Sequence, residues 1–138
     1  MGTNDPRQAE LLEKIRQGID SALGITGMIG GRFIACSKQL RVEPGTEAFT
    51  LLSGEIANLG DLLALVQEIR KGVGFLADRT VTADAFVSWE KSIPLFREII
   101  AALEGKDWIT LADLMQYELA PLLEAGEKEL AGVRELLA

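Results

Sequence analysis

The spacing of apolar residues in the stretch 107–138 is the feature of this sequence that most constrains its fold. Apolar side chains recur there at intervals of three or four, which return to one face of an α-helix. These residues are Trp108, Leu111, Met115, Leu119, Leu122, Leu130, Val133 and Leu137, with a gap at Gly126. Between Glu104 and Glu135 there are eight acidic and three basic residues, so the opposite face is charged and solvated. Such a helix has to bury its apolar face against other helices.

Three earlier stretches share this spacing and supply the partners. We predict helices at residues 6–42, 47–77, 83–104 and 108–136. Proline and glycine punctuate the chain between them, and no stretch shows the period-two alternation of a strand. We therefore predict an all-α protein, an antiparallel four-helix bundle with long first two helices. A chain of 138 residues is expected to form one domain over residues 1–138.

Four of the glycines in the first predicted helix lie close together, at positions 24, 27, 30 and 31. Each costs up to about 1 kcal/mol relative to alanine. One interpretation is a break at Gly30–Gly31. The other is a close contact with the second helix, because a hairpin folded at Pro44 puts small residues of both helices at matching heights. The uninterrupted apolar spacing favours the close contact, which would make Gly27→Leu destabilising. The residues of this close helix–helix contact would be Gly24, Gly27, Gly31, Ala57, Gly60 and Ala64.

The unequal helix lengths predict an exposed apolar end and a homodimer. The first predicted helix would run about 55 Å and the third about 33 Å. Side chains near the Pro44 turn would then stand above the shorter hairpin, and exposed apolar patches mark interfaces. The candidate interface residues are Phe33, Leu40, Phe49 and Leu52.

Prolines interrupt the third and fourth predicted helices. Pro94 and Pro121 each remove a backbone donor and clash with the preceding turn, so both helices are expected to kink. The kinks could open space for a small apolar ligand in the bundle core. The candidate pocket residues are Trp89, Phe96, Trp108 and Met115.

Charge and composition exclude several classes of function. Fourteen basic and twenty-one acidic residues give a net charge of −7, which argues against binding of nucleic acid. The sequence contains no histidine, which excludes phosphorelay domains, imidazole zinc sites and Ser-His or Cys-His nucleophile pairs. We predict no catalytic residue, no cofactor-binding residue and no metal-binding residue.

Two groups are candidates for a reactive site. Asp113 and Tyr117 lie four residues apart, and a local contact beside Pro121 is the simpler interpretation of this pair. Cys36, the single cysteine, lies on the apolar face of the first helix and is expected to be a small buried hydrophobe. Because the sequence has only one cysteine, an intrachain disulfide is excluded.

The remaining sequence signals concern location and charge. No basic-then-apolar signal segment opens the chain, and the uncharged run Ser21–Gly31 is shorter than the roughly 20 apolar residues that span a bilayer. We expect a cytoplasmic protein without membrane contact. Arg32, Lys38 and Arg41 form a basic stretch. Such a stretch is typical of a solvated face, or of a surface that pairs with the acidic fourth helix. The alternative is a binding site for an acidic partner protein.

One stretch carries a family resemblance. The segment Asp107-Trp-Ile-Thr-Leu-Ala-Asp-Leu-Met-Gln-Tyr-Glu-Leu-Ala-Pro-Leu-Leu-Glu124 resembles the end of small all-helical bacterial proteins with no assigned activity. This resemblance implies a helical fold and no functional residue. The length, acidity and heptads of the chain are also similar to those of flagellar or secretion chaperones of the helical type.

Two hypotheses for function follow. The first is a non-enzymatic adaptor or chaperone-like module that forms a homodimer or holds an amphipathic helix of another protein in an apolar groove. The alternative is a binder of a small apolar ligand near Pro94 and Pro121. An enzyme that uses carboxylates ranks third.

Overall fold

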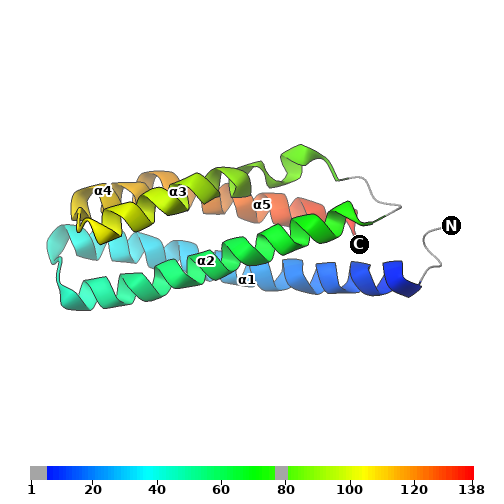
Figure 1. Ribbon diagram of the computed structural model, residues 1–138, viewed down its shortest axis with the longest axis horizontal. Coiled ribbons are helices and arrows are strands. Elements are labelled where there is room, and N and C mark those ends of the chain that lie inside the picture. The colour runs from blue at the N-terminus through cyan, green and yellow to red at the C-terminus, as the bar shows by residue number, and fades with distance from the viewer. Residues whose placement is uncertain (1–5, 77–80) are drawn as a thin grey trace.

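The computed structural model describes residues 6–76 and 81–138, which form an all-α, antiparallel four-helix bundle (Figure 1). These residues contain no strand. The first hairpin is α1 (Pro6–Val42) and α2 (Thr46–Gly74), and the second is α3 (Val87–Glu104) and a fourth helix. The short 3₁₀ segment η2 (Ala83–Phe86) precedes α3. The fourth helix consists of α4 (Trp108–Asp113), the π-helical segment η3 (Leu114–Leu119) and α5 (Ala120–Leu136). The predicted end at residue 42 and the predicted bounds 108–136 are confirmed. The predicted start at residue 6 coincides with the first described residue, and the predicted end at residue 77 lies outside the described residues.

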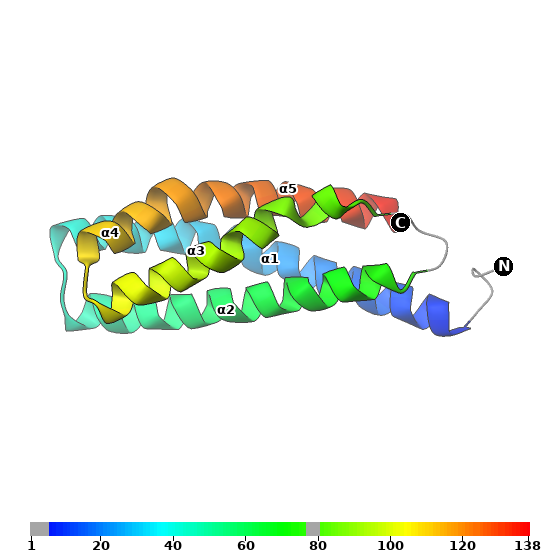
Figure 2. The same cartoon turned by 45° about the horizontal axis from the view of Figure 1, so that its top comes forward.

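The four helices enclose one core. α1 packs against α2 on one side and against α4, η3 and α5 on the other, and α3 packs against α2 and the fourth helix. Figure 2 shows the α1–α2 turn and the α3–α4 turn at the same end of the bundle. The largest fully buried side chains come from all four helices and include Ile19, Phe33, Leu52, Leu59, Trp89, Ile99, Leu111 and Leu119.

α1 is one uninterrupted helix of 37 residues, which excludes the alternative of a break at Gly30–Gly31. Its buried seam continues past the glycines through Thr26, Ile29 and Phe33. Packing of an apolar face contributes most of the stability of a helix in a protein, so it overrides the poor propensity of glycine.

The fourth helix begins at a side-chain cap and changes its winding before Pro121. The Asp107 carboxylate accepts a hydrogen bond from the backbone N–H of Thr110 at 3.2 Å. Further along, the N–H of Ala120 donates to the carbonyl of Met115, five residues back. Pro121 has no N–H to continue an α ladder, and the wider π turn of η3 lies just before it. The interruption expected at Pro121 therefore takes the form of a π segment.

Side chains of α1 hold the end of α5. The Nε of Arg16 donates a hydrogen bond of 2.8 Å to the carbonyl oxygen of Leu137, one of the carbonyls that a helix C-terminus leaves without an intrahelical donor. Arg134 pairs with Asp20 at 3.0 Å. These contacts fix the chain end beside the N-terminal half of α1.

α2 is the one helix in the described parts of the chain that is long and apolar enough to cross a membrane by length and composition alone. Its most apolar 18 residues have a mean hydropathy of 1.4. A core helix of a bundle gives the same signal, and Leu52, Leu59 and Val66 of α2 are buried in the core. The absence of membrane contact stays a prediction.

Candidate interaction surface

The glycines of α1 do not form the predicted close contact with α2. A Cβ atom added at Gly24, Gly27 or Gly31 would meet no heavy atom of a neighbour within 4 Å, and all three glycines are exposed. The prediction is wrong because the buried seam through Ile29 and Phe33 occupies another side of the helix. Matching heights along a hairpin do not fix the face that each residue occupies.

The small residues of α2 are also placed elsewhere. Ala57 and Ala64 are exposed to solvent. Gly60 faces α3, where an added Cβ would lie 3.2 Å from the ring of Phe96. None of the three forms the predicted contact with α1.

α1 and α2 do approach closely at glycines, but nearer the other end of the hairpin. A Cβ at Gly18 would lie 3.3 Å from Cγ1 of Ile69, and a Cβ at Gly72 would lie 3.1 Å from Cδ1 of Ile15. The pairing about Pro44 correctly places these positions at the same height. Gly18 and Gly72, which sequence reasoning missed, are therefore the small residues of this interface.

Three of the four candidate interface residues are buried inside the chain. The exposed fractions of Phe33, Leu40 and Leu52 are 0%, 3% and 0%. The fourth, Phe49, is 37% exposed, and its ring stands edge-on to that of Trp108 with 6.1 Å between centroids. The prediction of an exposed patch at these residues is wrong.

The fourth helix covers Phe33, Leu40 and Leu52 because it reaches the end of the first hairpin at which α1 turns into α2. The hydroxyl of Ser37 donates a hydrogen bond of 2.9 Å to the carbonyl of Ala112, and Arg41 pairs with Asp113 at 2.6 Å. The surplus length of α1 lies at its N-terminal end instead (Figure 2).

The four candidate pocket residues lie in separate contacts. Trp89 is 1% exposed and packs on Gly126, Phe96 packs on Gly60, Trp108 meets Phe49, and Met115 is fully buried. None of the four lines the surface hollows described below. A small-ligand site at these residues stays a prediction that these contacts do not support.

The groups weighed for reactivity have structural partners. Arg41 pairs with Asp113, and its guanidinium lies 5.8 Å from the centroid of the Tyr117 ring. Arg41 therefore acts as a counterpart to the acidic fourth helix. Burial, and secondly the charge of Glu55, raise the pKa of the Cys36 thiol, which disfavours the nucleophilic thiolate.

The middle of α1 presents apolar side chains to solvent. Ile25, Met28 and Ile34 are 37%, 57% and 36% exposed, and no charged residue lies between Asp20 and Arg32. We name this region the α1 surface, defined by Gly24, Ile25, Gly27, Met28, Gly31 and Ile34. The sequence signal for this surface is the uncharged run Ser21–Gly31, which is too short to span a bilayer.

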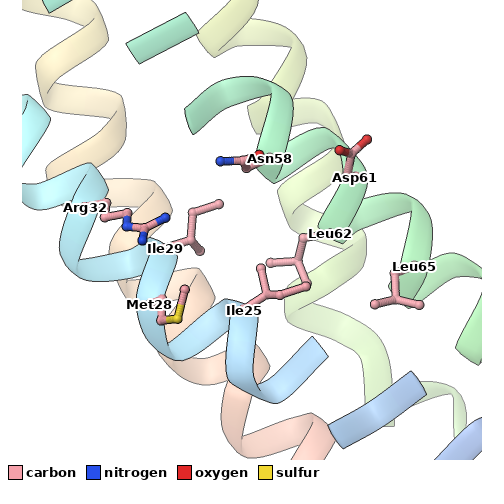
Figure 3. Close-up of a pocket in the computed structure, with 8 residues that line it drawn as sticks. All are labelled: Ile25, Met28, Ile29, Arg32, Asn58, Asp61, Leu62 and Leu65. Carbon is pink, nitrogen blue, oxygen red and sulfur yellow. The ribbon is translucent and has the colours of Figure 1, made fainter. Parts of the chain in front are cut away.

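A hollow lies on each side of the α1 surface. The first, of about 350 Å³, lies between α1 and α2 (Figure 3). Its lining is Ile25, Met28, Ile29, Arg32, Asn58, Asp61, Leu62 and Leu65. The second, of about 260 Å³, lies between α1 and the fourth helix, and its lining includes Gly27, Gly30, Ile34, Pro121, Glu124 and Glu127. α1 thus forms an apolar ridge between two depressions.

Charged groups border the first hollow. Figure 3 shows Arg32 on α1 and Asp61 on α2 at its rim, with Ile25 and Leu62 adjacent between the two helices. Arg32 lies 3.7 Å from Glu55, whose Oε2 is buried without a hydrogen-bond partner among the described residues. Asp61 has no ion pair within the described part of the chain. The site combines apolar anchors with one charge of each sign.

Fold and surface together define an all-α helical bundle with an exposed apolar ridge, and the described residues contain no group of three or more potential metal ligands of the Asp, Glu, Cys or His type. The chain belongs to the family described as a domain of unknown function, DUF8042, whose model matches residues 8–129. This match agrees with the expectation of a family with no assigned activity. Searches of curated proteins and of solved structures found no match.

Proposed function

We propose that this protein is a non-enzymatic protein–protein interaction module of the adaptor or chaperone-like type, which binds through the α1 surface. The observation that carries the proposal is the set of exposed glycines at 24, 27 and 31. Each costs the helix up to about 1 kcal/mol relative to alanine, and no contact among the described residues requires a missing side chain there. Close approach of a partner backbone gives these residues a role.

The binding mode follows from the shape and chemistry of the surface. Ile25 and Met28 supply exposed apolar anchors beside the hollow between α1 and α2. A partner helix with an apolar face would lie along α1 and place apolar side chains in this depression, in the manner of helix-in-groove complexes. Arg32 and Asp61 at the rim would select the charge pattern of the partner.

We further propose that the module carries out no chemistry; the cytoplasm stays the compartment expected from the sequence. The support is the packing of the candidate groups: Asp113 and Tyr117 both contact Arg41, and the Cys36 thiol has a raised pKa. No observation favours the small-ligand alternative over a protein partner.

Photo-crosslinking in the cell that makes the protein tests this proposal. A photoreactive phenylalanine derivative replaces Met28 in one variant and Ile109 in another, because both are exposed apolar residues, at 57% and 74%. We expect protein adducts from position 28 and none from position 109. Equal adduct patterns at both positions, or no adduct at position 28, would overturn the proposed binding surface.

A further inference from the structure

The outer face of α1 changes in character along its length. Residues spaced by three or four lie on one face of a helix, and one such row is exposed from end to end. It consists of Glu10, Glu13, Gln17, Asp20, Gly24, Met28, Gly31, Ala35 and Lys38. The row is acidic at its N-terminal end, small and apolar in the middle, and basic at its C-terminal end. An antiparallel copy of the same row is complementary to it in charge.

From this pattern we infer that the partner at the α1 surface is a second copy of this chain, with α1 packed antiparallel against α1 about a two-fold axis. The inference rests on the proposed function and names its partner. Because the contact is isologous, each copy supplies both halves of every pair. An axis between Gly27 and Met28 sets Gly24 of one copy opposite Gly31 of the other.

Charge fixes the relative direction of the two helices. In the antiparallel arrangement Lys38 lies opposite Gln17 of the second copy, within one helical turn of the second copy's Glu13 and Asp20. These two carboxylates are 59% exposed and pair in their own chain with Arg16 and Arg134, so Lys38 would join them as a further cation. In a parallel arrangement Lys38 would face Lys38, and Glu13 would face Glu13. Lys38 is exposed and has no ion pair within the described residues. Such complementarity selects the orientation more than it sets the affinity.

The middle of the row lets the two helices come close. Gly24 and Gly31 have no side chain, and the space around them is open, so the two axes can approach to about 8 Å. Met28, which is 57% exposed, then lies over the glycines of the other copy near the two-fold axis. The hollow beside it receives apolar side chains of the second chain, including Ile25.

Sedimentation equilibrium between micromolar and several hundred micromolar protein tests the pairing. We expect the mass to rise from 15.0 kDa per chain toward twice that value. Gly31→Leu should weaken the dimer at least about tenfold, since it adds bulk on both sides of a close contact. The matched control is Gly132→Leu on α5, another glycine with open space around it, which should leave dimerisation unchanged. Both variants should keep the monomer folded, as judged by circular dichroism.

Charge reversal tests the orientation. Lys38→Glu should weaken the dimer about tenfold, since it turns two attractive contacts into repulsive ones. The double variant Lys38→Glu/Glu13→Lys should restore the affinity, because in an antiparallel dimer each new lysine faces a new glutamate. In a parallel dimer both variants would only replace one like-charge contact by another, so neither should change the affinity. Lys91→Glu, at an exposed residue of α3, is the matched control and should have no effect.

The outcomes separate this inference from the function on which it rests. A chain that stays monomeric, or a dimer that Gly31→Leu and Lys38→Glu leave unchanged, overturns self-pairing through α1. If position 28 then cross-links specifically to a different protein, the interaction module stands and its partner is not a second copy. If position 28 gives no adduct at all, both proposals fail.

Discussion

The indole Nε1 of Trp89 donates a hydrogen bond of 3.0 Å to the carbonyl oxygen of Gly126, and the ring packs directly on the backbone of that glycine. A Cβ at position 126 would lie 2.7 Å from Cε2 of Trp89, well inside van der Waals contact. Trp89 itself is 1% exposed. The gap in the apolar spacing of the fourth helix is therefore the space that α5 leaves for an aromatic side chain of α3.

Gly126→Ala should destabilise the bundle by about 1–3 kcal/mol, because overpacking against a buried ring outweighs the better helix propensity of alanine. Gly132→Ala on the same helix is the control. Its added methyl group meets no neighbour within 4 Å, so it should stabilise the protein by up to about 1 kcal/mol. Urea unfolding measures both variants. A Gly126→Ala chain as stable as Gly132→Ala would contradict the packing described here.

The helices could be predicted because their signal is local. An apolar residue at every third or fourth position indicates which face of a helix is buried. Each of the four predicted helices shows this spacing independently of the others. The bundle follows, since four amphipathic helices with short connections have few other ways to bury their faces. The predicted end at residue 42 and the predicted bounds 108–136 agree with the structure, because proline and glycine next to these helices limit them.

The contacts between helices could not be predicted in the same way. A glycine lacks a side chain, so its position in a helix does not say whether it faces a neighbour or solvent. Gly24, Gly27 and Gly31 face solvent, whereas Gly18 and Gly126 face neighbours. That the glycines of the α1 surface face solvent follows only from the structure, which shows which side of α1 the other helices cover.

Gly18→Leu should force α1 and α2 apart and lower the free energy of unfolding by about 1–3 kcal/mol or more. The reason is that Ile69 already lies 3.3 Å from the position of a Cβ at residue 18. Gly27→Leu on the same helix serves as the control and should not destabilise the monomer, since the space at Gly27 is open. Urea unfolding at a concentration where the chain is monomeric compares the two. A larger loss from Gly27→Leu would restore the rejected close contact.

The Asp107 cap should make stability depend on pH. Hydrogen bonds from Thr110, side chain first and backbone second, hold the pKa of Asp107 below its ordinary value. A lowered pKa in the folded state stabilises the fold above the ordinary value of about 3.9 and ceases to do so as the pH falls through the lowered one.

Asp107→Ala should therefore lower the thermal midpoint at neutral pH, and its difference from the native chain should shrink as the pH falls below about 4. Asp107→Asn is the control, because an asparagine caps a helix without a titrating charge. Calorimetry between pH 7 and pH 3 records the midpoints. A difference between Asp107→Ala and the native chain that stays constant over this range would mean that the carboxylate does not cap α4.

The start of α3 depends on a carboxylate from α5. Glu129 accepts a hydrogen bond of 3.0 Å from the backbone N–H of Ser88, and also one from the Ser88 hydroxyl. Ser88 is the second residue of α3 and is 6% exposed. Its N–H is one of the donors that a helix N-terminus leaves without an intrahelical partner, and a negative charge there interacts favourably with the helix dipole. Glu129 therefore caps a helix to which it does not belong.

Glu129→Ala should cost about 1–3 kcal/mol, since it leaves the buried N–H of Ser88 without an acceptor. Glu129→Gln should cost less, because an amide oxygen can still accept that hydrogen bond while the charge is lost. Glu127→Ala, at an exposed position of the same helix, is the matched control and should stay within about 0.5 kcal/mol of the native chain. Urea unfolding gives the free energies, and amide hydrogen exchange at Ser88 should accelerate in Glu129→Ala ahead of the rest of α3. If Glu129→Ala and Glu127→Ala unfold at the same urea concentration, the start of α3 does not depend on this carboxylate.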